Sequence, residues 1–469
     1  MTFSQGIEST SPEPIHQPRV PMTDRQIAGK DLRTIVPRSA HAKWQPAADR
    51  PDPIALLEQS SQGRIQSLIP IRYGRMLRSP FAFLRGSASI MAADLATTPS
   101  TGLRVQACGD AHLLNFGGYA TPERNLVFGL NDFDETLPAP WEWDVKRLAT
   151  SIVVAGRDMK LSADDCREIA YAGIRSYREN MSRYAQKTVL EVWYSRIDIS
   201  ILLELTNGSR HHKHVQRHME KARTRTSHSV FPKLTQVVDG ERRIIDNPPL
   251  IYHLPPHDSL EAEVREVMEH YRHSVRDDLH VLLDRYRLAD IAIKVVGVGS
   301  VGTRCAIALL MAGENDPLFL QIKEARPSVL EPYAGKSVYQ NHGQRVVAGQ
   351  RLMQAASDMF LGWAQSDQNY DFYIRQLRDM KISVDLDKLS RSTFLAYSQL
   401  CGWALSRAHA RSGDAAMITG YIGKSDVFEK AIADFAVAYA DQTEQDYQSF
   451  VDAVKWGRLP VLTEEILGR

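Results

Sequence analysis

This chain of 469 residues has few cysteines, almost no excess of either charge and no long apolar run. The cysteines number only four and stand far apart without CxxC spacing, at Cys108, Cys166, Cys305 and Cys401. This usage argues against a disulfide framework or a zinc ribbon and is typical of a reducing compartment. The 57 basic and 56 acidic residues leave a net charge of +1. Charge alone therefore gives no reason to expect nucleic acid or an anionic membrane as a partner.

Targeting and membrane segments are also missing. The opening MTFSQGIESTSPEP has neither the basic region nor the apolar core of a signal peptide. No apolar run approaches the roughly 18 residues of a membrane span. We therefore expect a cytoplasmic protein without membrane contacts, and the sequence leaves its oligomeric state open.

What remains is the composition of an ordinary globular protein, 43% hydrophobic and 24% charged. Residues 1–50, rich in Pro, Ser, Gln and Arg, are predicted to be a flexible arm with one short ordered piece. Residues 51–288 are predicted to be mainly helical, residues 289–382 β-rich and residues 383–469 helical again. At about 150 residues per domain, this length suits two to four domains or a large two-lobed enzyme. The expected fold class is α+β.

Hydrophobic periodicity places individual elements within these regions. Helices are expected at 259–287, 340–366, 389–412 and 426–456. Strands are expected at 103–110, at 126–135, within 290–326 and near 371–378.

A polar, basic stretch at 207–258 interrupts the second region and ends in a Pro-rich linker. Its densest part, 209–228, could bind an acidic substrate, although a solvated surface is the simpler interpretation. His211, His214 and His218 have a spacing that suits a metal on a helix, but no acid stands in register to complete such a site.

The chemistry is concentrated in two loops that follow the first two strands. Asp110 and Asn115 lie five residues apart, and Asp132 and Asp134 follow at the end of the next strand. Phosphoryl transfer needs one Asp to orient an acceptor hydroxyl, and an Asn and a further Asp to hold Mg²⁺. The alternative, that these acids only cap turns, does not explain their pairing with Asn115 or the absence of balancing lysines.

The motifs GDAHLLNF, LVFGLNDFDET and PWEWDVKRLATS together resemble an uncharacterised bacterial family classed with the protein-kinase-like superfamily. That resemblance covers the chain from about residue 70 onward. A shorter resemblance, limited to the catalytic stretch, links it to the aminoglycoside and choline phosphotransferases. Their loop has the pattern H-G-D-x-H-x-x-N followed by I-D-F-D.

The resemblance implies a role for each matching residue. Asp110 would be the catalytic base, and Asn115 and Asp132 the metal ligands. Asp134 would assist the metal or position the loop. His112 stands where those enzymes also carry a histidine, with a role in substrate contact or loop support.

Two further positions concern the support of this loop. Asp144 matches the aspartate that begins the next helix and ties back to the catalytic loop, so its expected role is structural. Cys108 departs from the pattern, because the related loops usually carry His there. The departure removes one supporting hydrogen bond and leaves the chemistry intact.

A glycine-rich segment follows much later, with the pattern G-x-G-x-x-G at Gly297, Val298, Gly299, Ser300, Val301 and Gly302. In a dinucleotide-binding fold this pattern lies between a strand and a helix, with an acid such as Glu324 ending the next strand. In a kinase-like fold it caps a hairpin over the nucleotide phosphates, and a lysine follows on the third strand. A plain β-turn is the structural alternative.

The kinase-like interpretation accounts for both loops at once. Lys323 stands 21 residues after Gly302, where it would contact the phosphates, and Glu331 is the candidate for its acidic partner. The dinucleotide interpretation leaves Asp110, Asn115 and Asp132 without a task. We therefore predict ATP (or GTP) and Mg²⁺ as cofactors.

The order of these parts is unusual, because a kinase chain normally carries its glycine loop before its catalytic loop. Here the catalytic loop comes about 190 residues earlier. We therefore expect a circularly permuted, two-lobed kinase-like fold in which the C-terminal helices dock beside the N-terminal catalytic loop.

The predicted activity is transfer of the γ-phosphoryl group to a hydroxyl of an unidentified acceptor. A small molecule is favoured by analogy with the phosphotransferases. The alternatives are a pseudokinase-type nucleotide-binding module and an enzyme that binds NAD or transfers a nucleotidyl group.

Overall fold

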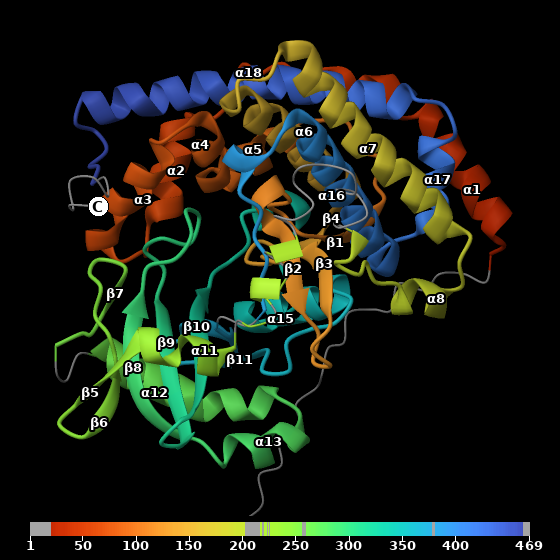
Figure 1. Ribbon diagram of the computed structural model, residues 1–469. Coiled ribbons are helices and arrows are strands. Elements are labelled where there is room, and N and C mark those ends of the chain that lie inside the picture. Colours follow the sequence, from red (N-terminus) through yellow and green to blue (C-terminus); the bar gives the residue numbers. More distant parts are fainter. Residues whose placement is uncertain are drawn as a thin grey trace, which may run out of the picture.

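The computed structural model describes residues 20–201, 216–217, 220–222, 224, 226–255, 259–377 and 380–462. Helices from both halves of the chain form the upper part of the molecule in Figure 1, and an antiparallel sheet forms the lower part. His211, His214 and His218, together with much of the basic run, lie outside the described residues. Within those residues, no helix combines the length and apolar character needed to cross a membrane.

Four long helices carry the largest hydrophobic core. They are α6 (Trp141–Asp158), α7 (Ala163–Ala185), α16 (Arg391–Ser412) and α18 (Val427–Lys455). Local signals define their ends: the Ser390 hydroxyl caps α16, and Glu142 and Asp144 lie in the first turn of α6, where the helix dipole favours acids. Because the first two helices precede the sheet in sequence and the last two follow it, this core joins distant parts of the chain.

The N-terminal residues depart from the flexible arm that their composition predicted. Helix α1 (Met22–Asp31) packs on α17 (Ala415–Ile422), and Arg33 donates hydrogen bonds to the carbonyl oxygens of Gly420 and Tyr421. These contacts are mainly polar, which explains why apolar periodicity did not reveal them. Residues 1–19 of the predicted arm lie outside the described residues.

Four shorter helices lie between the N-terminal segment and the first strand. They are α2 (Pro53–Ser61), α3 (Ile69–Met76), α4 (Pro80–Gly86) and α5 (Ala88–Leu95). The Asp52 and Ser79 side chains cap α2 and α4, and a proline opens each of these two helices. Apolar residues of α2 to α5 share a core with the end of α18.

The main sheet has six antiparallel strands in the order β11-β12-β10-β9-β8-β7. Their bounds are β7 Ile251–Tyr252, β8 Arg287–Lys294, β9 Cys305–Gly313, β10 Asp316–Ala325, β11 Gly362–Gln365 and β12 Asp371–Gln376. The strands predicted within 290–326 and near 371–378 are confirmed. Strand β11 falls where a helix was predicted, because α15 (His342–Met353) ends well before residue 366.

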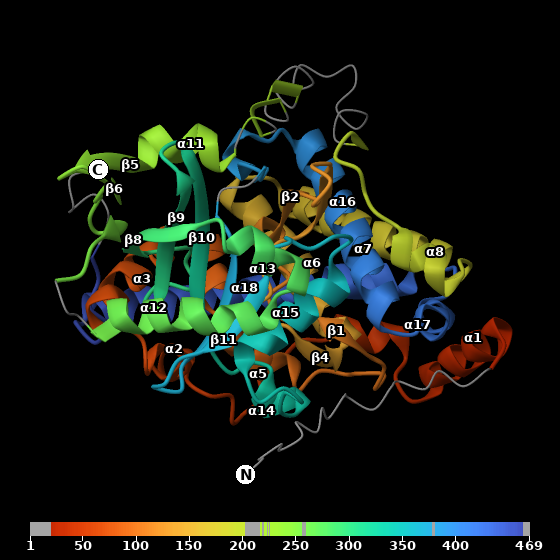
Figure 2. The same ribbon diagram turned by 90° about the horizontal axis from the view of Figure 1, so that it is seen from below.

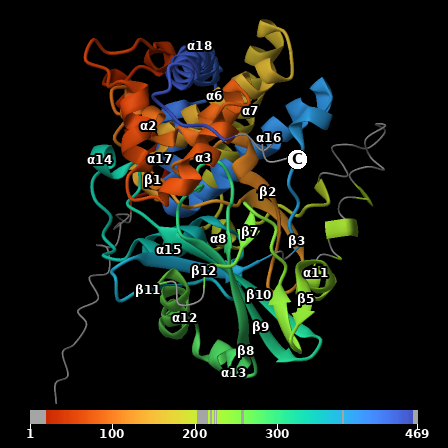
Figure 3. The same ribbon diagram turned by 90° about the vertical axis from the view of Figure 1, so that its left-hand side faces the viewer.

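Both faces of this sheet are covered. Helices α12 (Ser259–Tyr271) and α13 (Asp277–Leu283) bury one face, and α11 (Ser227–Leu234) packs on the other. Figure 2 shows α12 crossing the strands, and Figure 3 shows α11 and α12 on opposite sides. The predicted single helix 259–287 is therefore two helices, and the sheet region begins before residue 289.

Three two-stranded ladders complete the fold. Strand β1 (Arg104–Ala107) pairs with β4 (Leu137–Pro140), and β2 (Phe116–Ala120) pairs with β3 (Leu126–Leu130). These two ladders hold the loops that carry the predicted catalytic acids. The third, β5 (Thr235–Val238) with β6 (Glu241–Ile244), lies within the polar, basic stretch predicted at 207–258.

Candidate active site

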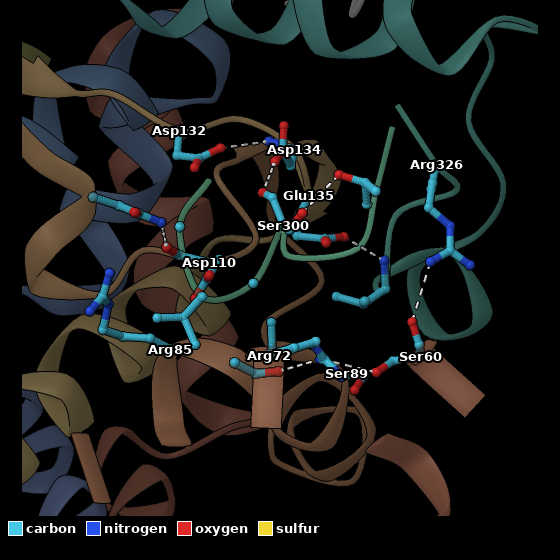
Figure 4. A pocket seen from close by; sticks show the side chains of 18 of the residues that line it. Ser60, Arg72, Arg85, Ser89, Asp110, Asp132, Asp134, Glu135, Ser300 and Arg326 are labelled. Carbon is cyan, nitrogen blue, oxygen red and sulfur yellow. Dashed lines mark hydrogen bonds between the residues drawn. The ribbon is translucent and has the colours of Figure 1, made fainter. Parts of the chain in front are cut away.

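One cavity of about 270 Å³ receives residues from both predicted motifs, although nearly 190 positions separate them in the chain. Figure 4 shows the acids of the N-terminal loops facing Ser300 of the glycine-rich loop. The predicted site residues that line it are Asp110, His112, Asn115, Asp132, Asp134, Gly297, Gly299 and Ser300. Val301 and Gly302 belong to the same loop without lining the cavity, and Lys323 reaches it through Asp134.

The start of α6 fixes the loop after β1 through hydrogen bonds to its backbone. The two carboxylate oxygens of Asp144 accept hydrogen bonds from the backbone N–H groups of Cys108 (2.6 Å) and Gly109 (2.9 Å). Nε2 of His409, near the end of α16, lies 3.2 Å from the same carboxylate. The predicted tie between Asp144 and the catalytic loop is thus present, and a C-terminal helix contributes to it.

Asp110 is held on one side only. Its Oδ1 accepts two hydrogen bonds from the Arg147 guanidinium, at 2.9 and 2.7 Å. Among the described residues, its Oδ2 has no hydrogen bond, and His112 Nε2 lies 3.7 Å from it. Burial raises the pKa of Asp110, although the positive charge of Arg147 opposes the rise. This geometry leaves one carboxylate oxygen turned toward the cavity and available to a hydroxyl group.

His112 is almost fully buried beneath the loop, with an exposed fraction of 4%. Burial places the pKa of its imidazole well below the ordinary value, and the nearby Arg85 and Arg147 charges add to this effect. The backbone N–H of His112 donates a hydrogen bond to Asp110 O, which closes the turn of the loop.

Two oxygen donors remain available where the metal ligands were predicted. The Asn115 amide nitrogen donates to the Asp110 carbonyl oxygen (2.6 Å), which leaves the Asn115 amide oxygen free to coordinate. Asp132 accepts only a weak hydrogen bond from Asp134 N (3.3 Å) and has no ion-pair partner among the described residues. Burial and the neighbouring Asp134 raise the pKa of Asp132. An amide oxygen beside a carboxylate without an ion-pair partner among the described residues suits Mg²⁺, which prefers hard oxygen ligands.

Asp134 is bonded to three elements of the sheet region. It accepts hydrogen bonds from Lys323 Nζ (2.8 Å), the Ser300 hydroxyl (2.9 Å) and the Tyr373 hydroxyl (2.6 Å). Although burial opposes it, the positive charge of Lys323 lowers the pKa of Asp134 to about 2. Asp134 therefore serves to position the sheet relative to the acidic loops.

Lys323 does not pair with Glu331, the candidate acid on the following helix. Glu331 instead lies 3.7 Å from Nδ1 of His342. The next long helix, α15, presents the buried Arg345, which donates to the carbonyl oxygens of Asp134, Thr136 and Arg326. Helix α15 therefore carries an arginine where an acidic partner for Lys323 was expected. The acid that pairs with Lys323 is Asp134, from the loop after β3.

The glycine-rich loop joins two antiparallel strands, β8 and β9. Gly297 and Gly302 have φ of 57° and 87°, a region that glycine adopts readily. The segment after Gly302 is a strand rather than a helix. The dinucleotide interpretation required a strand–turn–helix unit with parallel strands, so that geometry is absent here.

The N-terminal helices hold this loop from outside. Arg64, which follows α2, donates to the carbonyl oxygens of Gly299 (2.8 Å) and Val301 (2.7 Å). The backbone N–H of Ile65 donates to Gly302 O at 2.7 Å. The glycine-rich loop is therefore bound to a segment that precedes the acidic loops in sequence.

Comparison with known proteins gives one family and no characterised relative. No curated protein matches the chain, and no solved structure matches it. A family model matches residues 64–453, which include every residue that we placed at the cavity except Ser60. The chain belongs to this family, DUF2252, which is described as an uncharacterized protein conserved in bacteria.

Proposed function

We propose that this protein is a Mg²⁺-dependent phosphotransferase of the kinase-like type. The observation that carries the proposal is the shared cavity, in which Asp110, Asn115 and Asp132 face the glycine-rich loop. An acidic loop and a glycine-rich hairpin in one cavity are what transfer from a nucleotide requires. Either motif alone would be weak support, because turns that contain glycine or acids are common.

The arrangement of the sheet supports a kinase-like, two-lobed interpretation. The glycine-rich loop lies between β8 and β9, Lys323 lies on the adjacent β10, and α15 intervenes between β10 and β11. The protein-kinase pattern has a glycine-rich hairpin followed by a lysine on the third strand. In our proposal, the sheet region is the nucleotide-binding lobe and the helical core is the catalytic lobe.

The contacts of α16 support the proposed circular permutation. Its residue Ser412 accepts a hydrogen bond from Gln106 N in β1 (3.1 Å), and His409 lies against Asp144. The end of α16 thus lies beside the strand that leads into the catalytic loop. A chain that ran directly from α16 into β1 would have the usual order of kinase motifs.

Each residue then has a defined task. Asp110 Oδ2 orients the acceptor hydroxyl and takes its proton as the hydroxyl oxygen bonds to the γ-phosphorus. The bond between that phosphorus and the β–γ bridging oxygen breaks, and the nucleoside diphosphate leaves. Lys323 and the backbone N–H groups of the glycine-rich loop hold the phosphates, and Asn115 and Asp132 would hold Mg²⁺, which neutralises phosphate charge.

A thermal-shift titration tests the proposal without knowledge of the acceptor. Wild-type protein and Asp132→Ala are titrated with ATP, GTP and NAD, each with and without Mg²⁺. A ligand that binds the folded state raises Tm by mass action. We expect a Mg²⁺-dependent rise with ATP or GTP that Asp132→Ala abolishes. A rise with NAD alone, unchanged by Mg²⁺ and by the substitution, would refute the proposal.

Product analysis separates transfer from binding alone. A pseudokinase-type module would show the thermal shift and form no product, whereas a nucleotidyl transferase would attach AMP to its acceptor. The proposed activity releases ADP or GDP. Mass spectrometry of the nucleotide after incubation with bacterial small-molecule extract distinguishes these three outcomes.

A further inference from the structure

One wall of the cavity is basic. Helices α2 to α5 and the segments between them contribute Arg64, Arg72 and Arg85, and none of these lies within ion-pair distance of a carboxylate in the described part of the chain. Most cavity acids are already neutralised: Asp110 pairs with Arg147, Asp134 with Lys323 and Glu324 with Arg304. A cation at Asp132 would therefore leave this wall with uncompensated positive charge.

Two of the three arginines have structural tasks. Arg64 holds the glycine-rich loop through two carbonyl oxygens. Arg72 is 2% exposed and donates to Ser60, Ser61 and the Gly86 carbonyl oxygen. These hydrogen bonds give Arg64 and Arg72 a structural reason to lie in the cavity wall.

Arg85 has no such task. It makes no hydrogen bond with any described residue, and its Nε is buried without a partner. Ser89, four residues later and also in the cavity wall, has a buried hydroxyl without a partner. Figure 4 shows both side chains at the cavity, with Arg85 below Asp110. A buried donor that lacks an acceptor costs free energy, so a ligand that supplied acceptors to these two groups would be stabilised.

A simpler interpretation is that Arg85 only balances the charges of Asp110 and Asp132. However, Asp110 already has two hydrogen bonds from Arg147, and Asp132 has the role of metal ligand. Arg85 also lies outside ion-pair distance of both acids. Charge balance therefore does not explain a guanidinium that has no hydrogen bond with any described residue and whose Nε is buried.

We propose that the acceptor carries an anionic group of its own, a phosphate or a carboxylate, which Arg85 binds with help from Ser89. This inference rests on the proposed function. Arginine recognises both groups through paired N–H donors. A cavity of about 270 Å³ has room for a small acceptor, such as a short phosphorylated or carboxylated alcohol.

The test titrates the full chain with inorganic phosphate and with malonate, and Tm is the readout. Each titration is carried out without nucleotide and with a saturating non-hydrolysable ATP analogue and Mg²⁺. The variants are Arg85→Gln and, as a matched control, Arg78→Gln, an exposed arginine just before α4 that does not line the cavity. The nucleotide itself is titrated against all three proteins.

We expect wild type and Arg78→Gln to bind one of the anions while the nucleotide is bound. Arg85→Gln should weaken that binding at least about tenfold, with nucleotide affinity unchanged. The free Arg85→Gln protein should melt no lower than wild type, because it loses a buried donor that has no partner.

Three outcomes overturn the inference. Equal anion binding by wild type and Arg85→Gln, or no anion binding by wild type, would show that Arg85 holds no acceptor anion. Weaker nucleotide binding by Arg85→Gln, with anion binding retained, would assign Arg85 to the nucleotide phosphates instead. If no nucleotide binds at all, the proposed function fails, and the nucleotide-free titration still decides whether Arg85 binds anions.

Discussion

Lys323 Nζ lies 2.8 Å from Asp134 Oδ2, and this ion pair joins two segments that stand 189 positions apart in the chain. Lys323 is only 2% exposed, so its charge is sheltered from water. The pair connects the sheet to the acidic loops and determines how the two halves of the cavity face each other.

A double-mutant cycle should reveal strong coupling across this pair. Lys323→Met leaves the Asp134 charge without its cation, and Asp134→Asn leaves a buried ammonium. Each single change should cost about 3 kcal/mol of unfolding free energy. The double variant should cost clearly less than the sum, because no unpaired charge remains. Urea unfolding provides the four values, and additive costs would show that the ion pair contributes no coupling.

Asp144 offers a second test, because its carboxylate satisfies two backbone donors of the catalytic loop. Asp144→Ala should cost about 2–5 kcal/mol, since the N–H groups of Cys108 and Gly109 lose their acceptor in a buried place. Asp144→Asn keeps one acceptor oxygen and should cost less. Urea unfolding measures both values. Equal stability of wild type and Asp144→Ala would mean that water replaces the carboxylate.

Two glycines with similar backbone angles provide a matched comparison. Gly102 has φ +79° with nothing within 4 Å of an added Cβ, whereas Gly109 has φ +81° and would place a Cβ 2.5 Å from the Glu135 carbonyl oxygen. Gly102→Ala should cost about 1 kcal/mol, from backbone strain alone. Gly109→Ala adds a clash with backbone and should cost at least twice as much. It should also weaken Mg²⁺-nucleotide binding, which Gly102→Ala should leave intact.

Local motifs could be predicted from the sequence because their residues lie close together along the chain. The five-residue spacing of Asp110 and Asn115 fixed their position in one loop, and Asp144 was identified from the start of the next helix. Hydrophobic periodicity located α16 and α18 and the strands within 290–326. The comparison confirms that the chain belongs to an uncharacterised bacterial family, and the kinase-like classification stays a prediction.

Partners that depend on tertiary structure could not be predicted. Glu331 was chosen for Lys323 by analogy, but the observed partner lies on a distant loop. Tyr373 completes the Asp134 cluster because it stands opposite Lys323 in the β10–β12 register, and the register is not visible in the sequence. Arg147 pairs with Asp110 because of the way α6 packs against the loop, and this packing is not visible in the sequence.

Glu135 should make the protein less stable as pH rises. Its carboxylate accepts a hydrogen bond from Val329 N, yet burial raises the pKa of Glu135 from 4.5 to about 7. Between these two values the folded chain binds more protons at this site than the unfolded chain. By linkage, Glu135 therefore lowers the free energy of unfolding progressively as pH rises from about 4.5 to 7.

Glu135→Gln removes this ionisation and keeps an oxygen that can accept the hydrogen bond from Val329. The variant should match wild type near pH 4, where the glutamate is protonated in both states, and should exceed it in stability above pH 7. Urea unfolding of both proteins from pH 4 to 8 gives the difference at each pH. A difference that stays constant over this range would show that Glu135 ionises in the folded protein as readily as in the unfolded chain. A difference that shrinks as pH rises would mean that the folded protein stabilises the charged carboxylate, which contradicts the burial argument.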